Sequence, residues 1–77
     1  MSISAFVFIE CKTGAARDVA KEAMKINGVK KADSVTGPYQ VITLIEAPDI
    51  DILGNNIITQ LHGLPGVLRT QTNLIVG

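Results

Sequence analysis

The sequence predicts an α+β fold in which four antiparallel strands form one sheet and two helices cover one of its faces. Two observations lead to this prediction. The chain matches its own pattern when it is shifted by about 38 residues, so that Val19 falls on Ile57, Gly28 on Gly66 and Val29 on Val67. Each half then reads as strand, helix, Gly–Val and strand. In addition, the two strands expected at the centre are apolar on both faces, whereas the second strand is charged.

The first half begins with a strand over residues 3–11, where β-branched and aromatic residues alternate. A helix follows Thr13–Gly14. Gly28 ends this helix, because glycine adopts the left-handed conformation without a Cβ clash. A polar strand over residues 29–36 completes the half. The apolar stripe of the helix consists of Ala16, Val19, Ala20, Ala23 and Met24.

The second half begins after the turn Gly37–Pro38–Tyr39 with an apolar strand over residues 41–47. Pro48 stops this strand, and Asp49 caps the second helix. The last strand covers residues 67–76. The apolar stripe of the second helix is Ile50, Leu53, Ile57 and Leu61, and the helix is broken by Gly63, Pro65 and Gly66.

The resulting order of elements is βαββαβ. Right-handed crossovers in both halves give the strand order 4-1-3-2 with both helices on one face, which is the ferredoxin-like sandwich. Strands one and three are then central, as their apolar residues on both faces require. Strand two lies at an edge, where Lys30, Lys31 and Asp33 discourage pairing with other chains.

Length and composition predict one domain over residues 1–77 that needs a partner. A chain of this size buries only about 60% of its unfolded surface. Cys11 is the only cysteine, which excludes a disulfide within the chain and a zinc site of several thiolates. Apolar residues make up 47% of the chain and charged ones 18%. Because two helices cover only one face of the sheet, we expect a homodimer packed through the other face.

Charge and hydropathy exclude several classes of partner. Seven basic and seven acidic residues give a net charge of zero, whereas a protein that binds the phosphate backbone carries a basic excess. No apolar run approaches the length of a membrane span, and the N-terminus lacks the basic region of a signal peptide. We therefore expect no direct contact with nucleic acid or membrane, and a cytoplasmic protein.

The residues that often carry chemistry have structural interpretations here. His62, the only histidine, lies in the last turn of the second helix, where a cation complements the helix dipole. Cys11 fits a buried small apolar position. Glu46 either pairs with a basic residue across the sheet or lines a site at a subunit interface. The sequence has no nucleophile elbow, phosphate loop or metal-ligand spacing. We therefore expect no catalytic residue, no metal, no cofactor and no enzyme activity.

The turn over residues 36–40 is the strongest candidate for a binding site. It offers a hydroxyl, backbone amides, an aromatic ring and a carboxamide at one end of a rigid sheet, where binding groups commonly gather. The alternative is ordinary turn chemistry, with Tyr39 closing the end of the core. The hydroxyls of Thr70 and Thr72 lie on one face of the last strand. They either form hydrogen bonds within the protein or line the same site. The predicted ligand-binding residues are Thr36, Gly37, Pro38, Tyr39, Gln40, Thr70 and Thr72.

Several motifs in this frame resemble one family. They are Ile26–Asn27–Gly28–Val29, the run Val35–Thr36–Gly37–Pro38–Tyr39–Gln40–Val41, Leu64–Pro65–Gly66–Val67, and Thr70–Gln71–Thr72. With them the chain resembles, over residues 3–76, the effector-binding (RAM) domain of the Lrp/AsnC feast/famine regulators. The resemblance implies dimers through the sheets, rings of dimers as octamers or decamers, and amino acids bound between dimers by the turn over residues 37–40.

The chain begins at the first strand, so it resembles a stand-alone member without the helix-turn-helix. Such a member senses amino acids or co-assembles with full-length Lrp/AsnC regulators. One departure is Gln40, because members commonly carry Asp after the aromatic residue of the turn. A carboxamide still accepts a hydrogen bond but brings no charge to meet a ligand's ammonium group.

The favoured function is an oligomeric, amino-acid-binding sensor or modulator of transcription regulators. One alternative is a small dimeric α/β-barrel enzyme of the monooxygenase or isomerase kind, which shares the fold and the dimer. Such enzymes usually place His, Asp, Trp or Tyr between sheet and helices, and this chain has no Trp, one His and one Tyr. The other alternative is a pure co-assembly module that binds no ligand.

Overall fold

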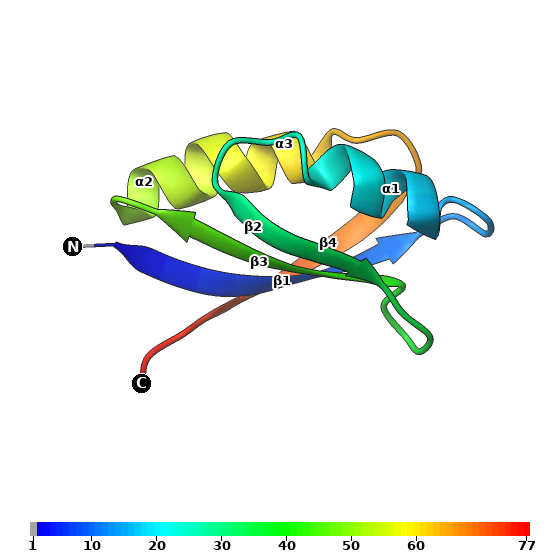
Figure 1. Ribbon diagram of the computed structural model, residues 1–77, viewed down its shortest axis with the longest axis horizontal. Helices are drawn as coiled ribbons and strands as arrows, with labels where there is room; N and C mark the ends of the chain where they lie inside the picture. The colour runs from blue at the N-terminus through cyan, green and yellow to red at the C-terminus, as the bar shows by residue number, and fades with distance from the viewer. Residues whose placement is uncertain (1) are drawn as a thin grey trace.

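The computed structural model describes residues 2–77. The element order is β1 (Ile3–Cys11), α1 (Ala16–Ala23), β2 (Val29–Ser34), β3 (Val41–Ala47), α2 (Ile50–Ile52), η1 (Leu53–Ile58), α3 (Thr59–His62) and β4 (Val67–Leu74). The strands form one antiparallel sheet in the order β2-β3-β1-β4, which is the predicted order viewed from the other edge. The helices all lie over one face of this sheet, and the opposite face is uncovered (Figure 1). The predicted ferredoxin-like fold is confirmed.

The core fills the layer between the sheet and the helices. Alternate residues of β1 and β3 point into it, because successive side chains of a strand point to opposite faces. The one polar core residue among those described is Thr43, whose hydroxyl donates a hydrogen bond of 3.1 Å to the carbonyl of Val7. The largest fully buried side chains are Ile9, Ile45, Leu53, Leu61, Val7, Val19, Val41 and Thr43.

The internal repeat is visible in the backbone. The N–H of Val29 donates to the carbonyl of Ile26, and about 38 residues later the N–H of Val67 donates to that of Leu64, at 3.1 and 3.2 Å. Gly28 and Gly66 occupy equivalent positions between helix and strand, with φ of +105° and +92°. At Gly28 an added Cβ would also collide with Ile57, so this position requires glycine.

The second helix is continuous from Ile50 to His62, but its middle part is a π turn. A π turn holds more residues than an α turn. Leu53, Ile57 and Leu61, which are spaced by four, therefore all stay buried. Asp49 caps the helix as predicted, because its Oδ1 accepts a hydrogen bond of 2.9 Å from the N–H of Ile52.

Some predicted positions differ. Ile50 is 52% exposed and Met24 is 47% exposed, so one end of each predicted apolar stripe lies outside the core. Met24 follows the last residue of α1, where the chain turns away from the helix. β2 ends at Ser34 and β4 at Leu74, two residues earlier than predicted at each strand. β2 ends there because the N–H of Val35 closes the following turn.

Candidate functional site

The turn between β2 and β3 is fixed at its base and open at its tip. The N–H of Val35 donates to the carbonyl of Gln40 at 2.8 Å, and the N–H of Gln40 donates to the carbonyl of Ile9 at 2.9 Å. At the tip, Gly37 has a φ of +128°, and no atom lies within 4 Å of the place where a Cβ would stand. The predicted residues Thr36 and Pro38 flank this glycine and are exposed.

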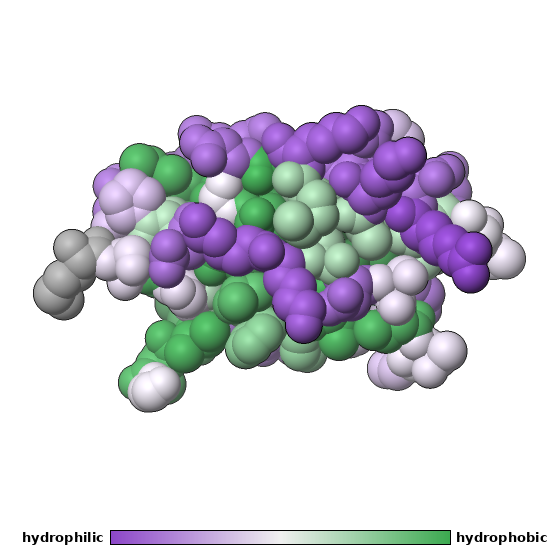
Figure 2. Space-filling view, in the orientation of Figure 1, coloured by the Kyte–Doolittle hydropathy of each residue, from purple (hydrophilic) through white to green (hydrophobic). Residues whose placement is uncertain are grey.

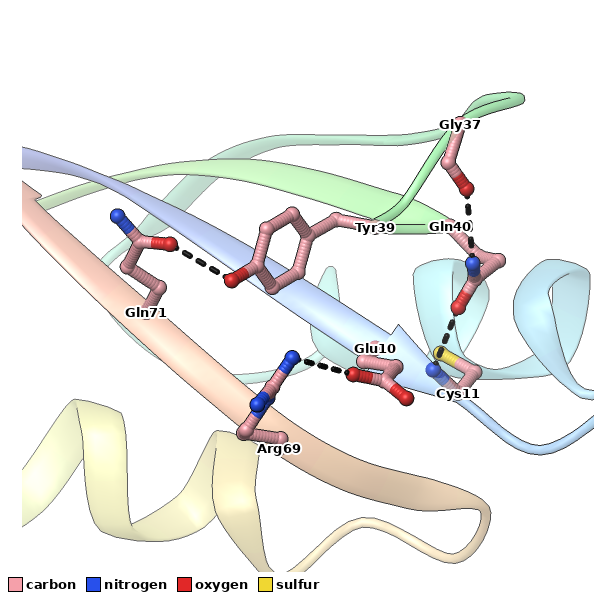
Figure 3. A network of polar contacts seen from close by, with 7 residues as sticks. All are labelled: Glu10, Cys11, Gly37, Tyr39, Gln40, Arg69 and Gln71. Carbon is pink, nitrogen blue, oxygen red and sulfur yellow. Dashed lines mark hydrogen bonds and ion pairs between the residues drawn. The ribbon is translucent and has the colours of Figure 1, made fainter.

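The carboxamide of Gln40 ties the turn to the end of β1 (Figure 3). Its Oε1 accepts a hydrogen bond of 2.8 Å from the N–H of Cys11, and its Nε2 donates one of 3.0 Å to the carbonyl of Gly37. An Asp at this position would have no N–H to donate to the carbonyl of Gly37. Both bonds, to Cys11 and to Gly37, therefore require the carboxamide of glutamine. The side chain acts as a brace of the turn.

Tyr39 lies over the uncovered face of the sheet. Its ring packs against Phe8 with 5.8 Å between the centroids, and its hydroxyl donates a hydrogen bond of 2.7 Å to Oε1 of Gln71. The guanidinium of Arg69 lies 6.0 Å from the centroid of the same ring. Tyr39 therefore does not close the core between sheet and helices. It links the turn to β1 and β4 on the opposite side of the sheet (Figure 3).

An ion pair lies beside this tyrosine. The Nη2 of Arg69 and the Oε1 of Glu10 are 2.9 Å apart, and the two residues face each other across β1 and β4. The side chain of Glu10 is 34% exposed and that of Arg69 is 68% exposed. Neither residue was predicted from the sequence, because only the register between the two strands brings them together.

Thr70 and Thr72 do not meet the turn within one chain. They pair with Ile9 and Val7 of β1, whose side chains face the helices. Directly paired residues share a face, so both threonines lie on the helix side of the edge strand. Gln71, which lies between them in sequence, faces the other side and binds Tyr39. The structure thus brings the five turn residues together and separates them from the two threonines.

The uncovered face has an apolar centre and a charged margin. Phe6 is 42% exposed, and its neighbours Phe8, Ile42 and Leu44 are half-buried. Toward the β2 edge, Glu46 pairs with Lys30 at 3.9 Å, which agrees with the first of the two alternatives given for this carboxylate. Figure 2 shows hydrophobic side chains along the lower side of the molecule, below the hydrophilic surface of the helices.

The remaining candidates do not form a reactive site. Burial raises the pKa of the Cys11 thiol, so it stays protonated. His62 lies at the end of α3, as predicted. Within residues 2–77 no three metal-binding side chains come together, and no helix there is long and apolar enough to cross a membrane. A groove of about 520 Å³ lies between α1 and residues 64–66, away from the turn.

Comparisons with known proteins agree with this architecture. The model of the family described as the Lrp/AsnC ligand binding domain matches residues 4–77. The crystal structure of TTHA0845 from Thermus thermophilus has a TM-score of 0.88 and 29% identity, covering 97% of this chain and 94% of that one. Escherichia coli AsnC has a TM-score of 0.87 at 18% identity, covering 97% of this chain and 51% of that one. At that identity the likeness concerns the fold alone.

Two longer proteins contain similar segments. A homocitrate synthase of Saccharolobus islandicus is 29% identical over 75 residues, which is 96% of this chain and 16% of that protein. The HTH-type transcriptional regulator LysM of Sulfurisphaera tokodaii is 29% identical over 59 residues, which is 77% of this chain and 41% of that protein. The chain thus spans less than half the length of either relative.

Proposed function

The chain belongs to the Lrp/AsnC ligand-binding domain family, and we propose that it is an oligomeric module that binds a free amino acid and thereby modulates transcription regulators. It is a regulatory ligand-binding domain of the Lrp/AsnC type. The observation that carries the proposal is the turn, which is braced by Gln40 and open at Gly37. A Neisseria meningitidis regulator with a TM-score of 0.82 and 18% identity, covering 97% of this chain and 50% of that one, is described in complex with L-Met.

The uncovered sheet face supports a homodimer as part of the proposal. Its centre is apolar, with Phe6 and Leu44 at least partly open to solvent, and ion pairs surround it. An apolar centre with a polar margin is the usual composition of a protein interface. A second copy covers this face with the same surface, in an isologous contact.

The ligand site then lies between copies. Thr70 and Thr72 lie on the opposite side of β4 from Tyr39, so one small ligand contacts both groups only if two copies supply them. The proposal therefore includes a ring of dimers, either octameric or decameric, with the turn of one copy and the threonines of another around each ligand. It also includes a cytoplasmic location, one domain over residues 1–77, and full-length Lrp/AsnC regulators as further partners.

The proposal excludes enzyme activity. A small α/β-barrel enzyme needs a cavity with titratable groups between sheet and helices. In the described part of the chain this layer is filled by fully buried aliphatic side chains such as Ile9, Ile45 and Leu61. The family is a regulatory one, and the segment shared with a homocitrate synthase is only 16% of that enzyme.

Thermal unfolding with each common amino acid at millimolar concentration tests the function. A ligand present at about 100 times its Kd adds about 2.7 kcal/mol of stability to the native state. In a domain of this size that raises Tm by several degrees. We expect such a shift with a few amino acids, and we expect Tyr39→Ala to abolish it. Met24→Ala, a matched exposed position on the helix side, leaves the shift intact.

Two other outcomes contradict the proposal. If no amino acid shifts the Tm of the unaltered protein, the chain is a co-assembly module rather than a sensor. Capture of a full-length Lrp/AsnC regulator without any response to amino acids then supports that alternative. If Tyr39→Ala binds as tightly as the unaltered protein, the ligand site lies outside the turn.

A further inference from the structure

The proposed site has no formal charge of its own. Its seven members, Thr36, Gly37, Pro38, Tyr39, Gln40, Thr70 and Thr72, are all uncharged. A free amino acid carries a carboxylate and an ammonium group, and moving either out of water without a partner is costly. Gln40 does not supply the missing partner, because Cys11 and Gly37 already occupy both ends of its carboxamide. The charged partners of an amino acid must therefore come from other residues.

The Glu10–Arg69 ion pair is the charged group in contact with this site. Arg69 lies over the ring of Tyr39 and directly precedes Thr70, so it touches one part of the site and is joined to the other. Glu10 directly precedes Cys11, to which Gln40 binds. The other ion pairs of residues 2–77 lie elsewhere. They are Lys25–Glu22 at the C-terminal end of α1, with Lys30–Glu46 and Lys31–Asp33 toward the β2 edge.

We propose that Glu10 and Arg69 recognise the two charges of the amino acid by opening their mutual ion pair. This inference rests on the proposed function. The ligand's ammonium group donates hydrogen bonds to the carboxylate of Glu10, and the guanidinium of Arg69 donates two parallel hydrogen bonds to the ligand's carboxylate. The fork of an arginine matches the two oxygens of a carboxylate.

The exposure of the two side chains fits such an exchange. Glu10 is two-thirds buried, whereas Arg69 is 68% exposed and has a long side chain with several rotatable bonds. An ion pair at the surface contributes little to stability. Opening it therefore costs little, and two charge-assisted contacts with the ligand replace one internal contact.

The neighbouring rings indicate which amino acids fit. Tyr39 stands beside the ion pair and packs on Phe8 with 5.8 Å between the ring centroids, and its ring offers apolar surface to a ligand side chain. The hydroxyl of Tyr39 is already bonded to Gln71. Within residues 2–77, Arg69 is the one cation that lies over the ring of Tyr39. We therefore expect amino acids with uncharged, apolar side chains to bind most tightly.

Isothermal titration of the full chain tests the inference, with L-alanine, L-valine, L-leucine, L-isoleucine, L-methionine and L-phenylalanine as probes. The tightest of these is then compared with its own carboxamide, which lacks the carboxylate, and its N-acetyl derivative, which lacks the ammonium group. Arg69→Gln and Glu10→Gln each weaken binding of the amino acid about tenfold to a hundredfold. Arg69→Gln leaves the affinity for the carboxamide unchanged, and Glu10→Gln leaves that for the N-acetyl derivative unchanged.

Glu22→Gln is the matched control, because it removes one carboxylate from the ion pair at the C-terminal end of α1. It leaves every affinity unchanged. If Arg69→Gln does not fold, Arg69→Lys keeps the charge and loses the fork, and it gives a smaller loss with the same dependence on the ligand's carboxylate. Unchanged affinity of both Gln variants for the amino acid overturns the inference and leaves the proposed function intact. No binding of any amino acid by the unaltered protein overturns both.

Discussion

The two faces of the central strands differ although the same segments build them. On the helix side, β1 and β3 contribute small and β-branched residues such as Ala5, Val7 and Ile45, all of which are fully buried. On the uncovered side they contribute Phe6 and Leu44, which are larger or more exposed. Alternation along the strand separates the two sets completely.

The two faces therefore have different expected roles, one in the stability of the single subunit and the other in binding. The helix side is closed within one chain, so its packing stabilises the single subunit. The uncovered side keeps its aromatic residues half-open, and it carries Tyr39, Gln71 and the Glu10–Arg69 pair. A surface of this kind is expected where another molecule binds.

The largest expected effect comes from truncating the helix side. Ile45→Ala removes a fully buried side chain and leaves a cavity, so we expect the free energy of unfolding to fall by about 2–5 kcal/mol. Ile42→Ala, on the other face of the same strand, costs less, and its cost depends on protein concentration. Urea unfolding at two protein concentrations measures both. Equal and concentration-independent losses at the two positions contradict the comparison.

Removing one hydroxyl from each face gives a smaller effect. Thr43→Val removes the buried hydrogen bond to the carbonyl of Val7, so we expect a loss of about 0.5–1.5 kcal/mol in the free energy of unfolding. Tyr39→Phe removes an exposed bond to Gln71. We expect this change to leave both unfolding and amino-acid binding nearly unaltered, because the bond is exposed and the ring that contacts Phe8 and Arg69 is kept. A larger loss of unfolding free energy from Tyr39→Phe than from Thr43→Val would instead assign the hydroxyl of Tyr39 to the stability of the fold.

The brace formed by Gln40 makes a local contribution. Gln40→Ala frees the N–H of Cys11 and the carbonyl of Gly37, so we expect faster hydrogen exchange at the Cys11 amide. Amides in the middle of β1 keep their protection, because their ladder bonds remain. NMR-detected exchange measures the difference. An unchanged rate at Cys11 means that backbone contacts alone hold the turn.

The smallest effect concerns pH. Burial raises the pKa of the Cys11 thiol in the folded chain, so the unfolded chain loses this proton at lower pH. The contribution of the Cys11 thiol to the free energy of unfolding is therefore complete below its ordinary pKa of about 8.5. This contribution declines as the pH rises beyond that value. Urea midpoints between about pH 7 and pH 10 test this against Cys11→Ala. A decline of equal size in the variant assigns the effect to other groups.

Much of the fold was predictable because the pattern of apolar residues in each strand indicates which of its faces are buried. The limits of β1 and β3 agree with the prediction, since alternating or continuous apolar residues mark strands buried on one or both faces. The equivalence of Gly28 and Gly66 was visible in the repeat of the sequence. The π turn was not predictable, because a spacing of four residues also occurs in ordinary helices.

The site was predictable only within one segment. The turn over residues 36–40 is local, so its members were found together. Glu10 and Arg69 depend on the register between β1 and β4, which includes an irregularity between Glu10 and Cys11. The face of Thr70 and Thr72 depends on the same register. The internal bonds of Gln40 depend on the end of β1, which lies 29 residues away in sequence.

Sedimentation velocity at micromolar concentration tests the central claim, which is that the uncovered sheet face joins copies of this chain. We predict a species of at least twice the 8.2 kDa of one chain. Phe6→Glu shifts it toward the single chain with an unchanged far-UV circular dichroism spectrum. Met24→Glu, at a similarly exposed apolar residue on the helix side, does not. A single species of 8.2 kDa for the unaltered protein, or equal dissociation by both substitutions, contradicts the account.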